Sequence, residues 1–115
     1  MNSKPSTYTV LLLMNATAGW LALSRQQRAD YVEEHLLPLF GKFSHSCRVR
    51  MYDSEYFHAA VSDFLIIDTD NLKEYGYLME HLRDSKVYAE PYFEVKDIIV
   101  GQENAFKDFE NHLRG

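Results

Sequence analysis

The sequence has a single cysteine, no surplus of positive charge and no long hydrophobic run, and each absence excludes a class of protein. Cys47 has no second cysteine with which to form a disulfide within the chain. The first residues also lack the charged and then apolar pattern of a secretory signal, so we expect a cytoplasmic protein. The longest apolar run, Val10–Met14, is far shorter than the roughly 20 residues of a membrane-spanning helix, and we expect no membrane partner.

The charge balance argues against nucleic acid as a partner. The formal net charge is -5 and the sequence pI is about 5.4. Binding to phosphate backbones needs a clustered basic surface, which this composition does not favour. The sequence also contains no glycine-rich phosphate loop, nucleophilic serine motif or dinucleotide fingerprint. The common nucleotide-dependent enzyme classes are therefore not indicated.

The length and composition predict one folded domain. A chain of 115 residues with 46% hydrophobic residues is near the commonest domain size and can form one core. The polar stretch 1–6, which contains Pro5, is typical of a flexible N-terminal tail. We therefore expect a tail over residues 1–6 and a single α+β domain over residues 7–115.

Hydrophobic periodicity predicts the order strand, helix, strand, strand, helix, strand. Ser24 and Gln27 form a capping-box pattern, which starts the first helix at about Arg25, and Pro38 should kink or stop that helix. Asp70 should cap the second helix, which ends before Ser85. The predicted strands are 7–15, 46–53, 61–68 and 92–100; residues 87–91 are predicted to be a loop, and a short last helix follows Asn104.

This order is typical of the ferredoxin-like βαββαβ fold, whose four-stranded antiparallel sheet has the first and third strands in the centre. The sequence agrees, because these two strands have apolar residues on both faces. The second strand instead alternates, with Arg48, Arg50 and Tyr52 on one face, and the fourth alternates as well. Its faces are predicted to carry Phe93, Val95 and Ile99 on one side, and Tyr92, Glu94 and Lys96 on the other.

Two helices cover only one face of such a sheet, so the apolar centre of the other face needs another cover. We expect a second copy of the chain there, which makes a homodimer through the sheet face. Arg48, Arg50 and Tyr52 would then border the interface or a cavity, together with Tyr92 and Glu94 on the opposite edge. A buried Arg50 would need a partner, for which Asp63, Glu94 or an anionic ligand are the candidates.

The histidines predict no metal site, because none has the paired helical spacing of zinc enzymes and there are no cysteine pairs. His58 is the candidate general base, since it lies in the connection between two strands, where functional side chains are often presented. Asp53, Glu55 or Asp63 could orient its ring, and Asp63 is the second catalytic candidate. Trp20 is predicted to form part of the core or of a pocket wall.

Four segments together resemble the darcynin family of small bacterial and fungal proteins. They are 20–23 (W-L-A-L), 48–57 (R-V-R-M-Y-D-S-E-Y-F), 61–63 (V-S-D) and 92–95 (Y-F-E-V), and the resemblance spans residues 7–102. It implies a ferredoxin-like domain similar to the dimeric α+β barrel proteins. The family has no established activity, so the resemblance assigns no catalytic residue.

Two hypotheses about function follow. The first is a homodimeric α+β barrel that binds a small anionic or aromatic molecule without a cofactor, with a cofactor-independent oxygenase or isomerase as its enzymatic form. The second is a non-catalytic dimeric interaction or ligand-sensing module. Convergence of Arg50, His58 and Asp63 on one cavity would favour the first. Because one fold serves many functions, the fold alone does not decide between them.

Overall fold

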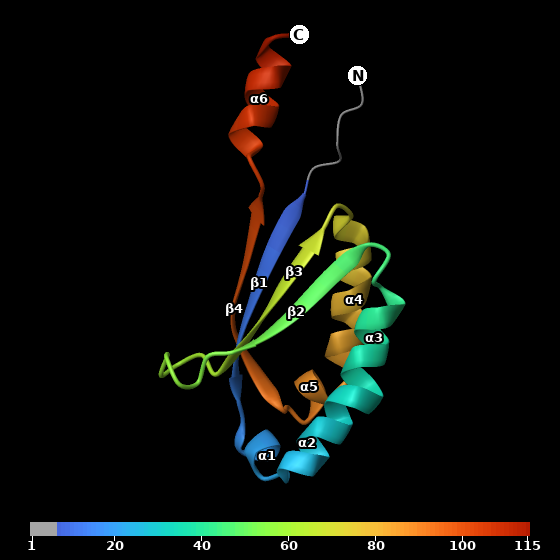
Figure 1. The fold of residues 1–115 in the computed structure, drawn as a ribbon, viewed down its shortest axis with the longest axis vertical. Coiled ribbons are helices and arrows are strands. Elements are labelled where there is room, and N and C mark those ends of the chain that lie inside the picture. Colours follow the sequence, from blue (N-terminus) through green and yellow to red (C-terminus); the bar gives the residue numbers. More distant parts are fainter. Residues whose placement is uncertain (1–6) are drawn as a thin grey trace.

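Four strands form one antiparallel sheet in the order β2-β3-β1-β4, and the main helices lie on one of its faces (Figure 1). The computed structural model describes residues 7–115, so the predicted tail 1–6 lies outside the described residues. The strands are β1 (Tyr8–Ala16), β2 (Cys47–Asp53), β3 (Asp63–Thr69) and β4 (Phe93–Gln102). The predicted α+β fold, with the first and third strands in the centre, is confirmed.

The helices follow the predicted order with additions. They are α1 (Ala18–Leu21), α2 (Arg25–Tyr31), the π-helical segment η1 (Val32–Leu36), α3 (Leu37–Lys42), α4 (Leu72–Asp84), α5 (Lys86–Ala89) and α6 (Ala105–Leu113). Helix α5 occupies the segment that we predicted to be a loop, because the Ser85 side chain caps it by accepting the N–H of Val87. No helix between residues 7 and 115 is both long and apolar enough to cross a bilayer.

The first long helix starts as predicted but does not stop at Pro38. The Ser24 hydroxyl accepts the N–H of Gln27, whose side chain accepts the N–H of Ser24, which confirms the capping box. The helix then widens into η1, where the N–H of Leu37 donates to the carbonyl of Val32. Pro38 lies in the first turn of α3, where its missing N–H costs little. The irregularity therefore precedes the proline, and the helix continues to Lys42.

Two other boundaries differ from the prediction for local reasons. The N-cap of α4 is Asn71, one residue after the predicted Asp70, and its side chain accepts the N–H of Glu74 at 3.1 Å. In β4, Met14 pairs with Val95 whereas Leu13 pairs with Asp97, so the register shifts by one residue between them. Because of this bulge, the side chains of β4 after Val95 point to the opposite face of the sheet from the one that strict alternation predicts. Ile99 consequently shares a face with Leu11 and not, as we predicted, with Phe93 and Val95.

The core lies between the sheet and the helical layer. Val10 and Leu12 of β1, Ile67 of β3, and Leu78 and Leu82 of α4 are all at most 2% exposed. Helix α6 stands beyond the end of the sheet, apart from this core (Figure 1), and its residues are exposed. The stability of the fold should therefore depend on the α4–sheet contact and little on α6.

Replacing Leu78 by alanine should lower the free energy of unfolding by about 2–5 kcal/mol, because the fully buried side chain would leave a cavity. Leu113→Ala in α6, where the side chain is 67% exposed, is the matched control and should change it by less than about 0.5 kcal/mol. Urea denaturation followed by circular dichroism measures both. Equal effects of the two substitutions would contradict this account of the core.

Candidate functional site

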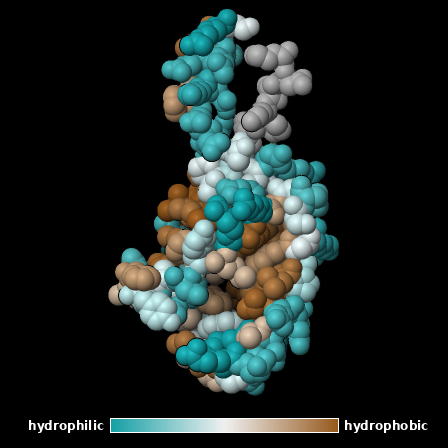
Figure 2. All heavy atoms as spheres, viewed as in Figure 1, coloured by the Kyte–Doolittle hydropathy of each residue, from teal (hydrophilic) through white to brown (hydrophobic). Residues whose placement is uncertain are grey.

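A cavity of about 920 Å³ opens between the helical layer and the end of the sheet that carries the β2–β3 loop. Figure 2 shows the surface hollowed beside this loop, with hydrophobic side chains around the hollow. The apolar part of the wall includes Met14, Val32, Leu36, Phe40 and Phe93. A mostly apolar cavity with a few polar groups is the usual form of a small-molecule site.

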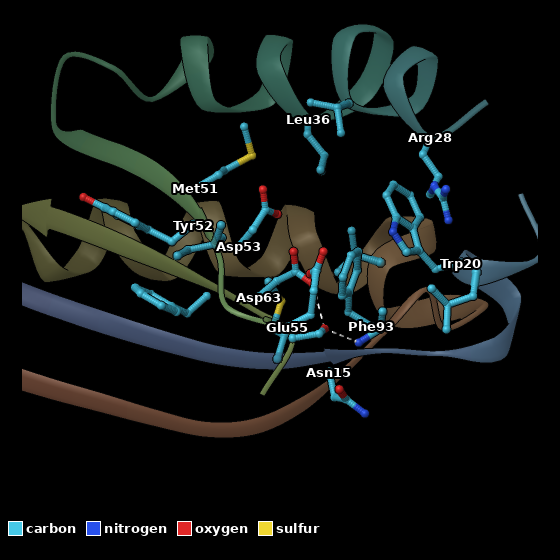
Figure 3. A pocket seen from close by; sticks show the side chains of 18 of the residues that line it. Asn15, Trp20, Arg28, Leu36, Met51, Tyr52, Asp53, Glu55, Asp63 and Phe93 are labelled. Atoms are coloured by element: carbon cyan, nitrogen blue, oxygen red, sulfur yellow. Dashed lines mark hydrogen bonds between the residues drawn. The ribbon is translucent and has the colours of Figure 1, made fainter. Parts of the chain in front are cut away.

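Three carboxylates lie together in this cavity (Figure 3). Asp53 and Asp63 are paired directly across β2 and β3 at the base of the loop, and Glu55 follows in the loop itself. Their oxygens lie within 4.8 Å of one another. The pKa of Asp63 is raised from 3.8 to about 6, chiefly by burial and in smaller part by the nearby Asp53 and Glu55 carboxylates. Asp63 is therefore poised to exchange a proton near neutral pH.

The Asp63 carboxylate is held in place by Ser62. The Ser62 hydroxyl donates to Asp63 Oδ2 at 2.7 Å and accepts the backbone N–H of Ala16 at 2.7 Å. The hydrogen bond from Ser62 favours the ionised form, so it opposes the rise in the pKa of Asp63. This fixed hydroxyl links the carboxylate to the end of β1, in the middle of the sheet.

The carboxylate cluster has the donor set of a site for a hard divalent cation, since Mg²⁺ and Ca²⁺ prefer carboxylate oxygens. Asp53 and Glu55 are exposed, however, and exposed acidic groups are commonly close together without an ion.

An aromatic cluster forms the wall on the other side of the cavity. The ring of Trp20 lies 5.3 Å from that of Tyr92 and 5.0 Å from that of Phe93, and its edge contacts Tyr31 at 6.0 Å. Trp20 thus has the predicted role in core and pocket wall. Tyr92 is buried in this cluster and not on a polar edge of the sheet, because it precedes β4 and its carbonyl accepts the Thr17 N–H and hydroxyl.

The helical wall carries features that the sequence did not reveal. Val32 and Leu36, the first and last residues of η1, both line the cavity. Arg25 and Arg28 of α2 line it as well, and Arg28 is partly buried. Figure 3 shows Arg28 beside Trp20, apart from Asp53 and Asp63. On sequence alone, Arg28 belonged to the polar face of an amphipathic helix, and nothing distinguished it from a solvated charge.

The structure does not bring the expected trio together. Asp63 lines the cavity, but neither His58 nor Arg50 does. His58 is exposed in the loop, and its Nδ1 accepts the backbone N–H groups of Ala60 and Val61 at 3.2 and 3.0 Å. These two backbone groups therefore orient the ring of His58, instead of the carboxylates that we expected.

Arg50 lies on the uncovered face of the sheet, where its partner is Asp68. Arg50 Nη2 donates to Asp68 Oδ2 at 3.0 Å, and Thr9 donates to Asp68 Oδ1 at 2.7 Å. The expected partners Asp63 and Glu94 lie elsewhere, Asp63 in the cavity and Glu94 opposite Asn15 at the other edge. Arg48 is an exposed residue two positions before Arg50, on the same face of β2.

Tyr52 lies where the uncovered face meets the cavity. Its ring stacks on Phe64 with the centroids 4.9 Å apart, and both residues line the cavity. The hydroxyl of Tyr52 accepts a hydrogen bond from Arg50 at 3.4 Å. Of the predicted ligand-binding residues, Trp20 and Tyr52 therefore line the cavity, whereas Arg48, Arg50, Tyr92 and Glu94 do not.

Comparison with solved structures shows the same fold in longer proteins. A mutant chlorite dismutase from Candidatus Nitrospira defluvii matches 87% of this chain with a TM-score of 0.73 and 12% identity. A heme-binding protein from Thermus thermophilus matches 95% with a TM-score of 0.75 and 17% identity. The chain spans 41% and 46% of these two proteins, less than half of each. At such low identity the likeness shows the fold alone.

Sequence comparison shows the family. Darcynin 1 from Acinetobacter baumannii is 35% identical over 91 residues, which are 79% of this chain and all of that protein. Darcynin from Chromobacterium violaceum is 37% identical over 76 residues, which are 66% of this chain and 95% of that protein. The family model described as "Darcynin, domain of unknown function" matches residues 1–111, beyond both ends of the span that we expected. The chain belongs to the Darcynin family.

Proposed function

We propose that this protein binds a small molecule in the cavity and transfers a proton to and from it through Asp63, as an isomerase does. The observation that carries the proposal is the position of Asp63. It is a half-buried carboxylate with a raised pKa, of about 6, in the wall of an open and largely apolar cavity. Carboxylates perturbed in this way are concentrated at functional sites.

The proposed reaction uses Asp63 first as a base and then as an acid. The carboxylate takes a proton from a carbon next to a carbonyl group, and the electron pair of the broken C–H bond moves into an enolate. In a substrate whose deprotonated carbon lies between the carbonyl group and a carbon–carbon double bond, the enolate is conjugated with that bond, and the protonated Asp63 then returns the proton to the far carbon of the double bond, which shifts the double bond toward the carbonyl group. A pKa near 6 suits both steps at neutral pH, because the group is ionised at rest and its acid form is strong enough to give the proton back. A cofactor-independent oxygenase would begin with the same deprotonation and use molecular oxygen as oxidant.

The π-helical segment η1 supports a site at this place. Such segments are rare, and they occur frequently at functional sites because the extra residue in the turn redirects side chains. Here the segment begins at Val32 and ends at Leu36, and both line the cavity. The irregular turn therefore lies on the wall that a ligand would contact.

Among the described residues, the cavity wall offers neither of the two commonest axial ligands of haem iron, although one structural neighbour is a heme-binding protein. Haem iron usually takes a histidine or a cysteine thiolate as its axial ligand. Among the described residues that line the cavity there is no histidine or cysteine. His81, for example, lies at 5.6 Å from the ring of Phe43, and Cys47 is buried in the core. We therefore propose a cofactor-free function.

We also propose that a second copy of the chain covers the uncovered face of the sheet. The side chains of Leu11, Leu13 and Ile66 on this face remain partly exposed, and Ile99 is 48% exposed. The ion pair of Arg50 and Asp68 lies among them, half-buried. A contiguous apolar face of this kind marks an interaction site. This surface also supports the second candidate function, a dimeric interaction module.

The proton-transfer proposal predicts hydrogen exchange into a bound ligand. Carbonyl-containing metabolites would be screened by thermal shift. A compound present at 100 times its dissociation constant raises the free energy of unfolding by about 2.7 kcal/mol. Hits would then be incubated with the protein in D₂O and followed by NMR. We expect deuterium at the carbon next to the carbonyl with the wild-type protein. Asp63→Asn should keep the thermal shift and lose the exchange, and exchange at the wild-type rate in this variant would refute the role of Asp63.

The raised pKa of Asp63 predicts a pH dependence of stability. Its folded-state pKa, about 6, lies above the ordinary value, 3.8, so the protonated form stabilises the fold. This contribution is complete below pH 3.8 and is lost as the pH rises through 6. Because Asp63 is only partly buried, solvent screening reduces this contribution to the free energy of unfolding to about 1–2 kcal/mol.

The measurement is urea denaturation of the wild type, Asp63→Asn and the exposed control Asp70→Asn at pH 4 and pH 7. Between pH 4 and pH 7, the free energy of unfolding of Asp63→Asn should rise by about 1–2 kcal/mol relative to that of the wild type, because asparagine does not ionise. Asp70→Asn should stay parallel to the wild type. Parallel behaviour of Asp63→Asn would show that the carboxylate titrates normally.

The second-copy proposal predicts a dimer in multi-angle light scattering. Ile66→Lys would bury an unpaired charge in the interface and should weaken dimerisation by about a hundredfold or more. Lysine is chosen because the chain is acidic, so the substitution does not add to charge repulsion. Tyr77→Lys on α4, where the side chain is 47% exposed, is the control. A wild-type monomer at high concentration would rule out this interface.

A further inference from the structure

Arg28 is a cavity-lining cation for which residues 7–115 supply no ion-pair or hydrogen-bond partner. Its side chain is partly buried in the wall next to Trp20 (Figure 3). Within residues 7–115, its guanidinium makes no hydrogen bond and no ion pair, whereas Arg50 on the opposite face of the sheet is paired with Asp68 at 3.0 Å. The guanidinium nitrogens of Arg28 are not among the buried polar atoms of the described residues, so they face the open cavity and are available for a partner from outside the chain.

The carboxylates of the cavity do not serve as that partner. Asp53, Glu55 and Asp63 contact one another, and Figure 3 shows them apart from Arg28. The two kinds of charge are therefore separated, with the acids at the base of the β2–β3 loop and the arginine on α2. Between them lie apolar side chains, among which are Phe93 and Leu36.

We infer that the ligand of this cavity is a small organic carboxylate, held with its carboxylate on Arg28, its apolar body against Trp20 and Phe93, and its reactive end at Asp63. The inference rests on the proposed function, because it names the class of molecule on which Asp63 would act. Arg25, also in the cavity wall, adds a second positive charge to the same side of α2. The planar guanidinium matches a carboxylate through two parallel hydrogen bonds.

The separation of charges also explains the orientation of the ligand. An organic acid placed the other way round would bring its carboxylate against three other carboxylates, which is unfavourable. With the carboxylate on Arg28, the end that meets Asp63 carries a proton that can be donated or abstracted. Arg28 would therefore both select ligands that carry a carboxylate and determine their orientation in the cavity.

Trp20 provides the measurement, because it is the only tryptophan of the chain and lines the cavity. Its fluorescence would be titrated at pH 7.5 with three phenols of similar size and different charge: 4-hydroxybenzoate, its neutral methyl ester and the cation tyramine. We expect 4-hydroxybenzoate to bind about tenfold or more tightly than the other two. This comparison uses the wild-type protein alone, so it does not depend on the folding of any variant.

Arg28→Gln should weaken the binding of 4-hydroxybenzoate about tenfold or more and leave the affinity for the methyl ester unchanged. The control is Arg83→Gln, an exposed position on α4 that does not line the cavity but changes the net charge equally. Arg28→Lys should restore part of the affinity, since it keeps the charge and loses the two-pronged hydrogen bonding.

The possible results separate the inference from the proposed function. If the ester or tyramine binds as tightly as 4-hydroxybenzoate, or if Arg28→Gln leaves the affinity for the acid unchanged, the carboxylate class is wrong while ligand binding in the cavity stands. If none of the probes changes the fluorescence of Trp20 and the metabolite screen gives no thermal shift, both the inference and the proposed function fall.

Discussion

The contact of Trp20 with Tyr31, Tyr92 and Phe93 is the interaction on which the cavity depends. These rings come from α1, from α2 and from the start of β4, segments far apart in the sequence, and they join the helical layer to the sheet at one end of the domain. At the other end the layers meet through smaller, fully buried side chains such as Leu78 and Ile67. Trp20 and Phe93 of this cluster both line the cavity, so the end of the domain with the aromatic cluster is also the end with the cavity.

Asp63 lies at a position where a carboxylate is unfavourable for the stability of the fold. It faces Asp53 directly across two antiparallel strands, and like charges at such positions destabilise a sheet. Burial first, and then the neighbouring carboxylates, oppose the ionisation of Asp63 and raise its pKa. Ser62 offsets part of this rise through one hydrogen bond. This electrostatically unfavourable arrangement in the wall of a largely apolar cavity supports the proposed proton exchange at Asp63.

The periodic part of the structure was predictable from the sequence, and the exceptions have identifiable causes. Apolar residues on both faces of the first and third strands correctly placed them in the centre of the sheet, and the Ser24–Gln27 capping box correctly started the first helix. The bulge in β4 was not predictable, because the pairing with β1 shifts by a single residue and this depends on tertiary contacts. Asp63 and Trp20 could be identified from the neighbouring sequence as candidate residues of a pocket. Arg28 could not, since a cation on the polar face of a helix looks solvated until the fold brings a cavity to it.

The cavity and the uncovered face of the sheet are separate surfaces that meet at one place. Arg50 and Asp68 pair on the uncovered face, whereas Asp63 and Arg28 lie in the cavity. Tyr52 belongs to both, because it stacks on Phe64 in the cavity wall and accepts a hydrogen bond from Arg50. A second copy packed on the uncovered face would immobilise Arg50 and, through it, the ring of Tyr52. Dimer formation and ligand binding would then be coupled through the stacked rings of Tyr52 and Phe64. By thermodynamic reciprocity, a ligand that fixed Tyr52 would strengthen dimerisation by the same factor as dimerisation strengthens ligand binding.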